Sequence, residues 1–168
     1  MRGFIAVDGG FEALVEPEEA RVLTSLAAQL QSLLGEAADD EALSEEDAAV
    51  ARLLPDAYRD DEDAAAEWRR LSRRALAERK AGFAARFAAA LAEATAASET
   101  TRILIDEAGG LDWVRAIGDL RLVLAERMGL HDEGDEPSEE DEGAAELYHW
   151  LAWMQDDLVG VLDAGWGE

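Results

Sequence analysis

The sequence predicts a mainly α-helical domain with a small β element, an α+β fold, and three observations support this. Long segments repeat apolar residues at intervals of three and four, the spacing of an amphipathic helix. A glycine-centred segment near the start is typical of a β-hairpin. The 168 residues, 49% hydrophobic with five tryptophans, can bury one sizeable core. We therefore expect one domain over residues 1–168, a bundle of about four to five helices with an N-terminal hairpin and one later strand.

The β element is predicted from two separate parts of the chain. Two β-prone runs, Phe4 to Val7 and Phe11 to Val15, flank Asp8-Gly9-Gly10. Glycine accepts the positive φ angles of a tight hairpin turn. Because an isolated hairpin is only marginally stable, it needs further support. The run TRILID, Thr101 to Asp106, is the expected third strand of an antiparallel sheet.

Three helical segments are expected between the hairpin and that strand. Pro17 suits the first turn of a helix whose apolar stripe runs to its expected end at Gly35. The segment Ser44-Glu45-Glu46-Asp47 resembles a capping box that opens a short helix through Leu54, which Pro55 stops. An Ala-rich helix then begins at residue 60 or 61 and runs to about residue 97.

The Ala-rich helix has two apolar sides that point in different directions. The early side is formed by Trp68, Leu71 and Ala75, and the later side by Leu76, Phe83, Phe87 and Leu91. Either the helix bends near Gly82, or its two halves face different partners.

The stretch Leu111 to Leu130 is predicted to be the central helix. Its apolar residues recur at helical spacing on more than one face, so it should be largely enclosed and end at Gly129. The last helix, about Gly143 to Leu162, should pack antiparallel to it as a helical hairpin. Between them, residues 131–142 carry eight acids and almost nothing apolar, which predicts a solvated, flexible loop.

Composition limits the functional classes. The chain has 39 acidic and 15 basic residues, a net charge of −24, which argues against binding to nucleic acid or anionic membranes. It has no cysteine, so disulfides and thiol chemistry are excluded. No apolar run is long enough for a membrane span or signal peptide, so we expect a cytoplasmic protein.

An arginine-rich run from Trp68 to Phe87 is the one candidate for DNA binding. Arg69, Arg73 and Lys80 lie within about 40° of one another on a helical wheel. Such a stripe could contact phosphates. We favour the other interpretation, that these cations neutralise acidic groups of the same molecule or of a partner.

No enzymatic or metal motif is found. His149 has no second histidine at metal-ligand spacing, and the acidic loop beside His131 lacks the alternating pattern of a calcium loop. We expect a protein that is not an enzyme and needs no cofactor.

Three segments together resemble a known family. They are RLLPDAYRDDEDAAAEWRRLS, WVRAIGDLRLVLAERMGL and LYHWLAWMQDDLVGVL. They are similar to an actinobacterial domain-of-unknown-function family typified by a mycobacterial oxidative-stress-responsive transcriptional regulator. The resemblance implies a cytoplasmic regulator that works through a sigma factor or another RNA polymerase component. The cysteine pair that senses oxidation in the mycobacterial member is absent here.

The resemblance also implies an alternative function and a set of positions to examine. Family genes commonly neighbour the adaptor of the Clp protease, which fits an interaction or structural module linked to proteolysis. A homodimer is a further alternative if Trp150 and Trp153 are exposed. The family motifs place an interaction site, or a purely structural ion network, at Arg52, Pro55, Tyr58, Asp61, Glu67, Arg69, Asp119 and Arg121. In either case Glu67 or Asp61 is expected to pair with Arg121 or Arg69.

Overall fold

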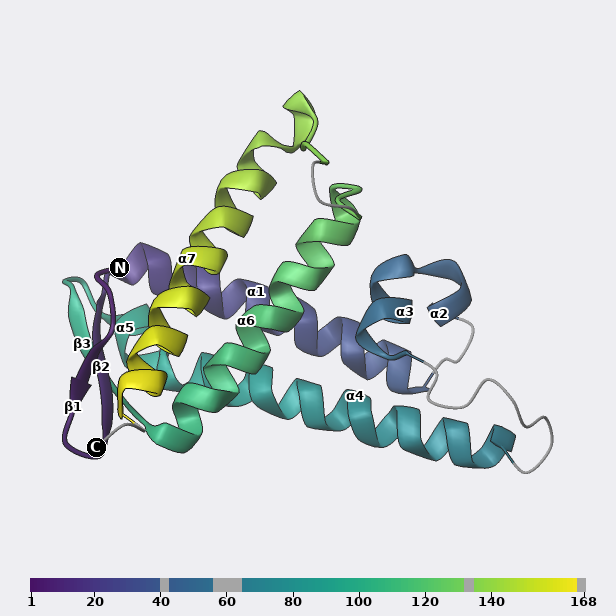
Figure 1. The fold of residues 1–168 in the computed structure, drawn as a ribbon, viewed down its shortest axis with the longest axis horizontal. Helices are drawn as coiled ribbons and strands as arrows, with labels where there is room; N and C mark the ends of the chain where they lie inside the picture. Colours follow the sequence, from purple (N-terminus) through teal and green to yellow (C-terminus); the bar gives the residue numbers. More distant parts are fainter. Residues whose placement is uncertain (40–42, 56–64, 132–134, 166–168) are drawn as a thin grey trace.

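The computed structural model describes residues 1–39, 43–55, 65–131 and 135–165 and shows a mainly α-helical fold with one small sheet (Figure 1). The described residues form four long α-helices and three short ones, with three antiparallel strands. The predicted fold class is therefore confirmed.

The sheet is built as the sequence predicted. Strands β1 (Ile5–Val7) and β2 (Gly10–Val15) form the hairpin, and β3 (Thr101–Asp106) pairs antiparallel with β2. Gly9 has a φ of 81°, a left-handed conformation that favours glycine. A side chain at Gly10 would lie 2.1 Å from the Ile105 carbonyl oxygen, so β2 and β3 approach closely only because this residue is glycine.

The two faces of the sheet differ sharply. Phe11, Ala13 and Val15 of β2 and Ile103 and Ile105 of β3 point towards the helices and are buried. On the outer face, Ile5 is 60% exposed and Leu104 is 65% exposed. The alternation of strand side chains produces this division.

The first helix is longer than expected. Helix α1 (Pro17–Asp39) continues through Gly35, so the prediction that this glycine ends the helix is wrong. Leu34 and Ala37 are both about 1% exposed. Their burial stabilises the last turns by more than the roughly 1 kcal/mol that a glycine costs inside a helix.

The expected capping box is placed differently in the structure. The segment forms two short helices, α2 (Leu43–Glu46) and α3 (Ala48–Leu53), separated by Asp47. The Asp47 carboxylate accepts hydrogen bonds from the backbone N–H groups of Ala49 (2.9 Å) and Val50 (3.3 Å). Asp47 is thus the N-cap of the longer of the two helices.

The Ala-rich segment forms α4 (Ala65–Ala90), which passes through Gly82 without a break. The chain turns at Leu91 and continues as α5 (Ala92–Ala96). The predicted early apolar side is wrong for the described side chains, since Leu71 is 51% exposed and Ala75 is also exposed. This part of α4 extends past the other long helices (Figure 1).

Two further long helices complete the fold. Helix α6 (Glu107–Arg127) is the predicted central helix, and it begins before Leu111 because the Asp106 carboxylate caps it at the Gly109 N–H, 2.7 Å away. A single 3-10 turn, η1 (Glu139–Asp141), precedes α7 (Glu142–Gly165). Val114 lies opposite Gln155 and Arg121 opposite Tyr148, which makes α6 and α7 the expected antiparallel pair.

The long helices form two layers, α1 with α4 and α6 with α7, and the sheet covers one end (Figure 1). Trp113 of α6 lies between them, 1% exposed, with its ring centroid 4.5 Å from that of Phe87 and 5.8 Å from that of Phe4. The enclosure predicted for the central helix is confirmed at Trp113, Ile117 and Leu120. This helix therefore positions the polar groups described next.

Candidate functional site

Helix α6 joins three other helices through polar side chains. Its side chains contact α4 at Asp112 and Asp119, α7 at Arg121, and the α3 region at Glu126 and Arg127. These contacts recur along the helix and point in different directions around it. The candidate site is therefore a set of contacts centred on α6.

Asp119 makes the most deeply buried of the described ion pairs on α6. Its side chain is 9% exposed and accepts a hydrogen bond from the Lys80 ammonium group of α4, which is 20% exposed. Burial raises the pKa of the Asp119 carboxyl above its ordinary value, and the hydrogen bond and charge of Lys80 oppose that rise without cancelling it. The pair holds α4 against α6.

Arg121 lies on the opposite side of α6, because two positions along a helix are about 200° apart. It donates to the Gln155 Oε1 atom at 2.7 Å and to the Tyr148 hydroxyl at 3.3 Å, and its guanidinium stacks on the Tyr148 ring at 5.0 Å. Gln155 is oriented in turn by its own hydrogen bond to the Val114 carbonyl at 2.9 Å. Asp119 and Arg121 thus act on different neighbouring helices.

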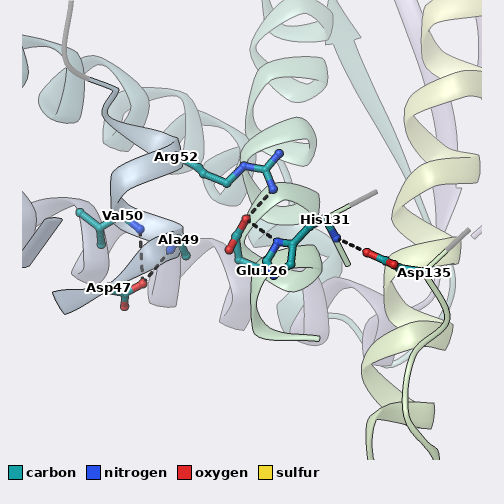
Figure 2. A network of polar contacts seen from close by, with 7 residues as sticks. All are labelled: Asp47, Ala49, Val50, Arg52, Glu126, His131 and Asp135. Carbon is teal, nitrogen blue, oxygen red and sulfur yellow. Dashed lines mark hydrogen bonds and ion pairs between the residues drawn. The ribbon is translucent and has the colours of Figure 1, made fainter. Parts of the chain in front are cut away.

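The end of α6 is tied to α3 and to the segment that follows it. The Glu126 carboxylate forms a hydrogen-bonded ion pair with Arg52, and the Nδ1 atom of the His131 ring lies 3.4 Å from the same carboxylate oxygen (Figure 2). Arg52 is the main reason that the pKa of Glu126 is lowered. One residue further on, Arg127 donates to the Asp47 carboxylate at 2.5 Å.

Asp47 therefore has two roles at once. Partial burial pushes its pKa up, but the hydrogen bonds from Arg127 and from the backbone of Val50 and Ala49 outweigh it, so the pKa is lowered. The same carboxylate caps α3 and ties that helix to α6.

The family-motif positions are only partly brought together. Arg52 and Arg121 line one cavity, whereas Asp119 lies on the other side of α6. The structure gives Arg121 two neutral partners on α7. The expected pairing of Glu67 or Asp61 with Arg121 or Arg69 stays a prediction. Tyr58 and Asp61 lie outside the described residues, as do the side chains of Glu67 and Arg69 on α4. Pro55 follows α3 and is exposed.

Of the expected basic stripe, Arg73 and Lys80 lie on the inward side of α4, and the Arg69 side chain is outside the described residues. Lys80 is bound to Asp119, and Arg73 is half-buried on the same side of α4 as Ala77, Ala84 and Phe87. Small alanines let α4 approach its neighbours, so the long Lys80 side chain between them reaches an acidic group of α6. The charge of Lys80 is thus neutralised by an acid of the same molecule.

Several residues of the site had no sequence signal. Glu126 contacts Arg52, which is 74 positions away, and Gln155 contacts Arg121, which is 34 positions away. His131 contacts Glu126 and Asp135, which are close to it in the chain. The polar character of Gln155 inside an apolar helical pattern was the one local hint.

The whole chain except its last residues matches one known family. Residues 1–162 match the family described as a domain of unknown function, DUF2017. The chain belongs to the DUF2017 family. This agrees with the resemblance seen in the three sequence segments, which run from Arg52 to Leu162.

Named relatives of this DUF2017 protein occur in mycobacteria. A Mycobacterium leprae protein that carries the name AosR is 30% identical, over 92% of this chain and 83% of its own length. The oxidative stress regulator AosR of Mycobacterium tuberculosis H37Rv is also 30% identical, over 90% of this chain and 82% of its own length. No solved structure gives a significant match.

Two features are absent from the described part of this DUF2017 chain. No group of three or more histidine, aspartate or glutamate residues there could hold a metal ion. No helix among the same residues is long and apolar enough to cross a membrane.

Proposed function

We infer that this DUF2017 protein is a non-enzymatic regulator that acts through a protein partner, with a sigma factor or RNA polymerase component as the first partner to test. The observation that carries this proposal is the similarity, over about nine-tenths of the chain, to proteins named oxidative stress regulators. Such a regulator would respond to a signal other than thiol oxidation, because this chain has no cysteine.

The arrangement of charge supports a protein partner over DNA. Phosphate binding requires accessible cations, and part of the positive charge of α4 is already paired, since Lys80 is engaged with Asp119 and Arg86 binds Asp112 at 2.5 Å. Arg70 and Arg79 of this helix are exposed. The net charge of −24 further repels a polyanion.

The exposed apolar side chains give this proposal a surface to test. Trp150 packs against the core, and Trp153 is 42% exposed, so the expected patch on α7 reduces to one large side chain. On the sheet, Ile5 and Leu104 both align with Glu12 of the middle strand and lie on the outer face. Glu12 lies between them, so the outer face presents two exposed aliphatic side chains on either side of one acidic side chain.

The deciding experiment is capture of the tagged chain from its native cells, with identification of bound proteins and direct binding to the purified candidates. Recovery and direct binding of a sigma factor or polymerase subunit supports the proposal. Recovery of Clp protease components supports the alternative role in proteolysis. If neither class of protein is recovered, both proposed functions are contradicted.

A matched pair of variants tests the sheet surface in the same experiment. Ile5→Ser with Leu104→Ser changes the outer face of the sheet, whereas Leu71→Ser changes an equally exposed aliphatic residue on α4. Loss of binding in the first variant alone would place the partner on the sheet, provided that both variants keep the wild-type thermal stability.

A further inference from the structure

A cavity of about 510 Å³ opens between the C-terminal end of α6 and the N-terminal end of α7. Leu122, Met128 and Leu130 form part of its apolar wall, and Arg121 and Tyr148 are among its polar groups. This volume, and an apolar wall with a few polar groups, are typical of small-molecule sites.

Arg121 is the charged group of this cavity that lacks an acidic partner. Among the described residues it makes no ion pair within 4.0 Å, although the chain has 39 acids. Its hydrogen bonds go to the neutral Gln155 and Tyr148, and its Nε atom is buried without a partner in the described part of the chain. A partly buried guanidinium is normally balanced by a carboxylate.

The other guanidinium of the cavity, Arg52, is already paired with an acid. Arg52 and His131 both contact Glu126 (Figure 2). Asp135, the acid among the described lining residues, accepts a hydrogen bond from the His131 backbone N–H at 2.8 Å. Among the described lining residues, Arg121 is therefore the guanidinium that no carboxylate contacts directly, and Asp135 is the one acid on the same lining.

The free donors of Arg121 define the chemistry of a ligand. A guanidinium has five N–H donors, of which Gln155 and Tyr148 use two and the buried Nε accounts for a third. One hydrogen remains on each terminal nitrogen, and a carboxylate oxygen can accept a charge-assisted hydrogen bond from either of them. A ligand with several negative charges would be repelled by the net charge of −24.

We propose that this cavity binds a small monocarboxylate with an apolar body, whose carboxylate pairs with Arg121 and whose body lies against Leu122, Met128 and Leu130. The site does not depend on the identity of the protein partner. It supplies a way for a chain without cysteine to respond to a small molecule.

The test compares carboxylates with their neutral amides in the full chain. Sodium benzoate, hexanoate and octanoate are titrated against benzamide, hexanamide and octanamide, and amide resonances of α6 and α7 are followed by two-dimensional NMR. We expect at least one carboxylate to cause saturable shifts in the resonances of Leu122, Tyr148 and their neighbours. The matching amide should bind at least about tenfold more weakly. The absence of saturable shifts for all three acids overturns the proposal, as does equal binding of acids and amides.

Two variants locate the binding. Arg121→Gln should weaken carboxylate binding by about tenfold or more, and Arg115→Gln should leave it unchanged, because Arg115 lies on the same helix but outside the cavity. Binding that survives Arg121→Gln overturns the proposal. If Arg121→Gln does not fold, the comparison of acids with amides in the wild-type chain still decides the question.

Discussion

Lys80 of α4 donates a hydrogen bond to the carboxylate of Asp119, which is buried in the middle of α6. The two residues are 39 positions apart and come from the two layers of the fold. Each would be out of place without the other, because Lys80 lies on the inward side of an alanine-rich helix and Asp119 interrupts an apolar one. Four predictions follow from this contact and its neighbours on α6.

The first prediction concerns the pair itself. Lys80→Met leaves Asp119 buried without its cation and should lower the free energy of unfolding by about 3 kcal/mol at pH 7. Adding Asp119→Asn to Lys80→Met should restore part of that loss, because no buried charge remains. Urea denaturation of the wild type, both single variants and the double variant measures the coupling. Additive effects of the two substitutions would contradict a direct interaction.

The second prediction concerns acid. The pKa of Glu126 is lowered from its ordinary value of 4.5, chiefly by Arg52, so the folded state binds this proton less readily than the unfolded state does. The stability that Glu126 contributes is therefore complete above about pH 4.5 and is lost as the pH falls through the lowered pKa. Glu126→Gln should destabilise the protein at pH 7, and the difference from wild type should shrink in acid.

Thermal denaturation between pH 3 and pH 7 measures this difference. Glu146→Gln, which removes an exposed acid of α7, is the control for the loss of one negative charge. A Glu126→Gln effect that is the same at every pH would exclude the ionised contact as its cause.

The third prediction separates the two roles of Asp47. Asp47→Ala removes both the cap of α3 and the partner of Arg127 and should cost about 1–2 kcal/mol. Asp47→Ser keeps a capping oxygen but not the charge, so it should cost less. Chemical denaturation of both variants gives the two contributions. Equal losses would mean that the cap adds little beyond the contact with Arg127.

The fourth prediction concerns the centre of the core. The Trp113 Nε1 atom is buried without a hydrogen-bond partner among the described residues. Trp113→Phe removes that donor but leaves a small void, so the two effects should nearly offset and the loss should stay below about 1.5 kcal/mol. Trp113→Ala should cost about 3–5 kcal/mol. Thermal unfolding followed by calorimetry or by circular dichroism, neither of which relies on tryptophan fluorescence, measures the stability loss of each variant. A loss of several kcal/mol in Trp113→Phe would contradict this account.

Local patterns predicted most of the elements correctly. The hairpin around Gly9, the third strand at Thr101–Asp106 and the antiparallel pair of long helices all appear where expected. Errors occurred where burial overrides a local preference, as at Gly35, or where one acidic residue in a cluster is selected as the cap, as at Asp47.

The candidate site was predicted only in part for a different reason. The family motifs marked Asp119 and Arg121, and the helical spacing marked Lys80 as part of a cationic stripe. It could not pair Asp119 with Lys80, or Arg121 with Gln155, because these residues are 39 and 34 positions apart. Such pairings depend on where the helices cross.

The sequence by itself therefore determined the helical character, the small sheet, the enclosed central helix and the family. Each of these depends on residue spacing or on motifs read along the chain. Only the tertiary structure decided that Asp119 and Arg121 contact different helices and that Lys80 points inward. It also placed Arg121 in a cavity without an acidic partner among the described residues. The packing of α4 and α7 on opposite sides of α6 is the physical reason, since it sets which distant side chains meet.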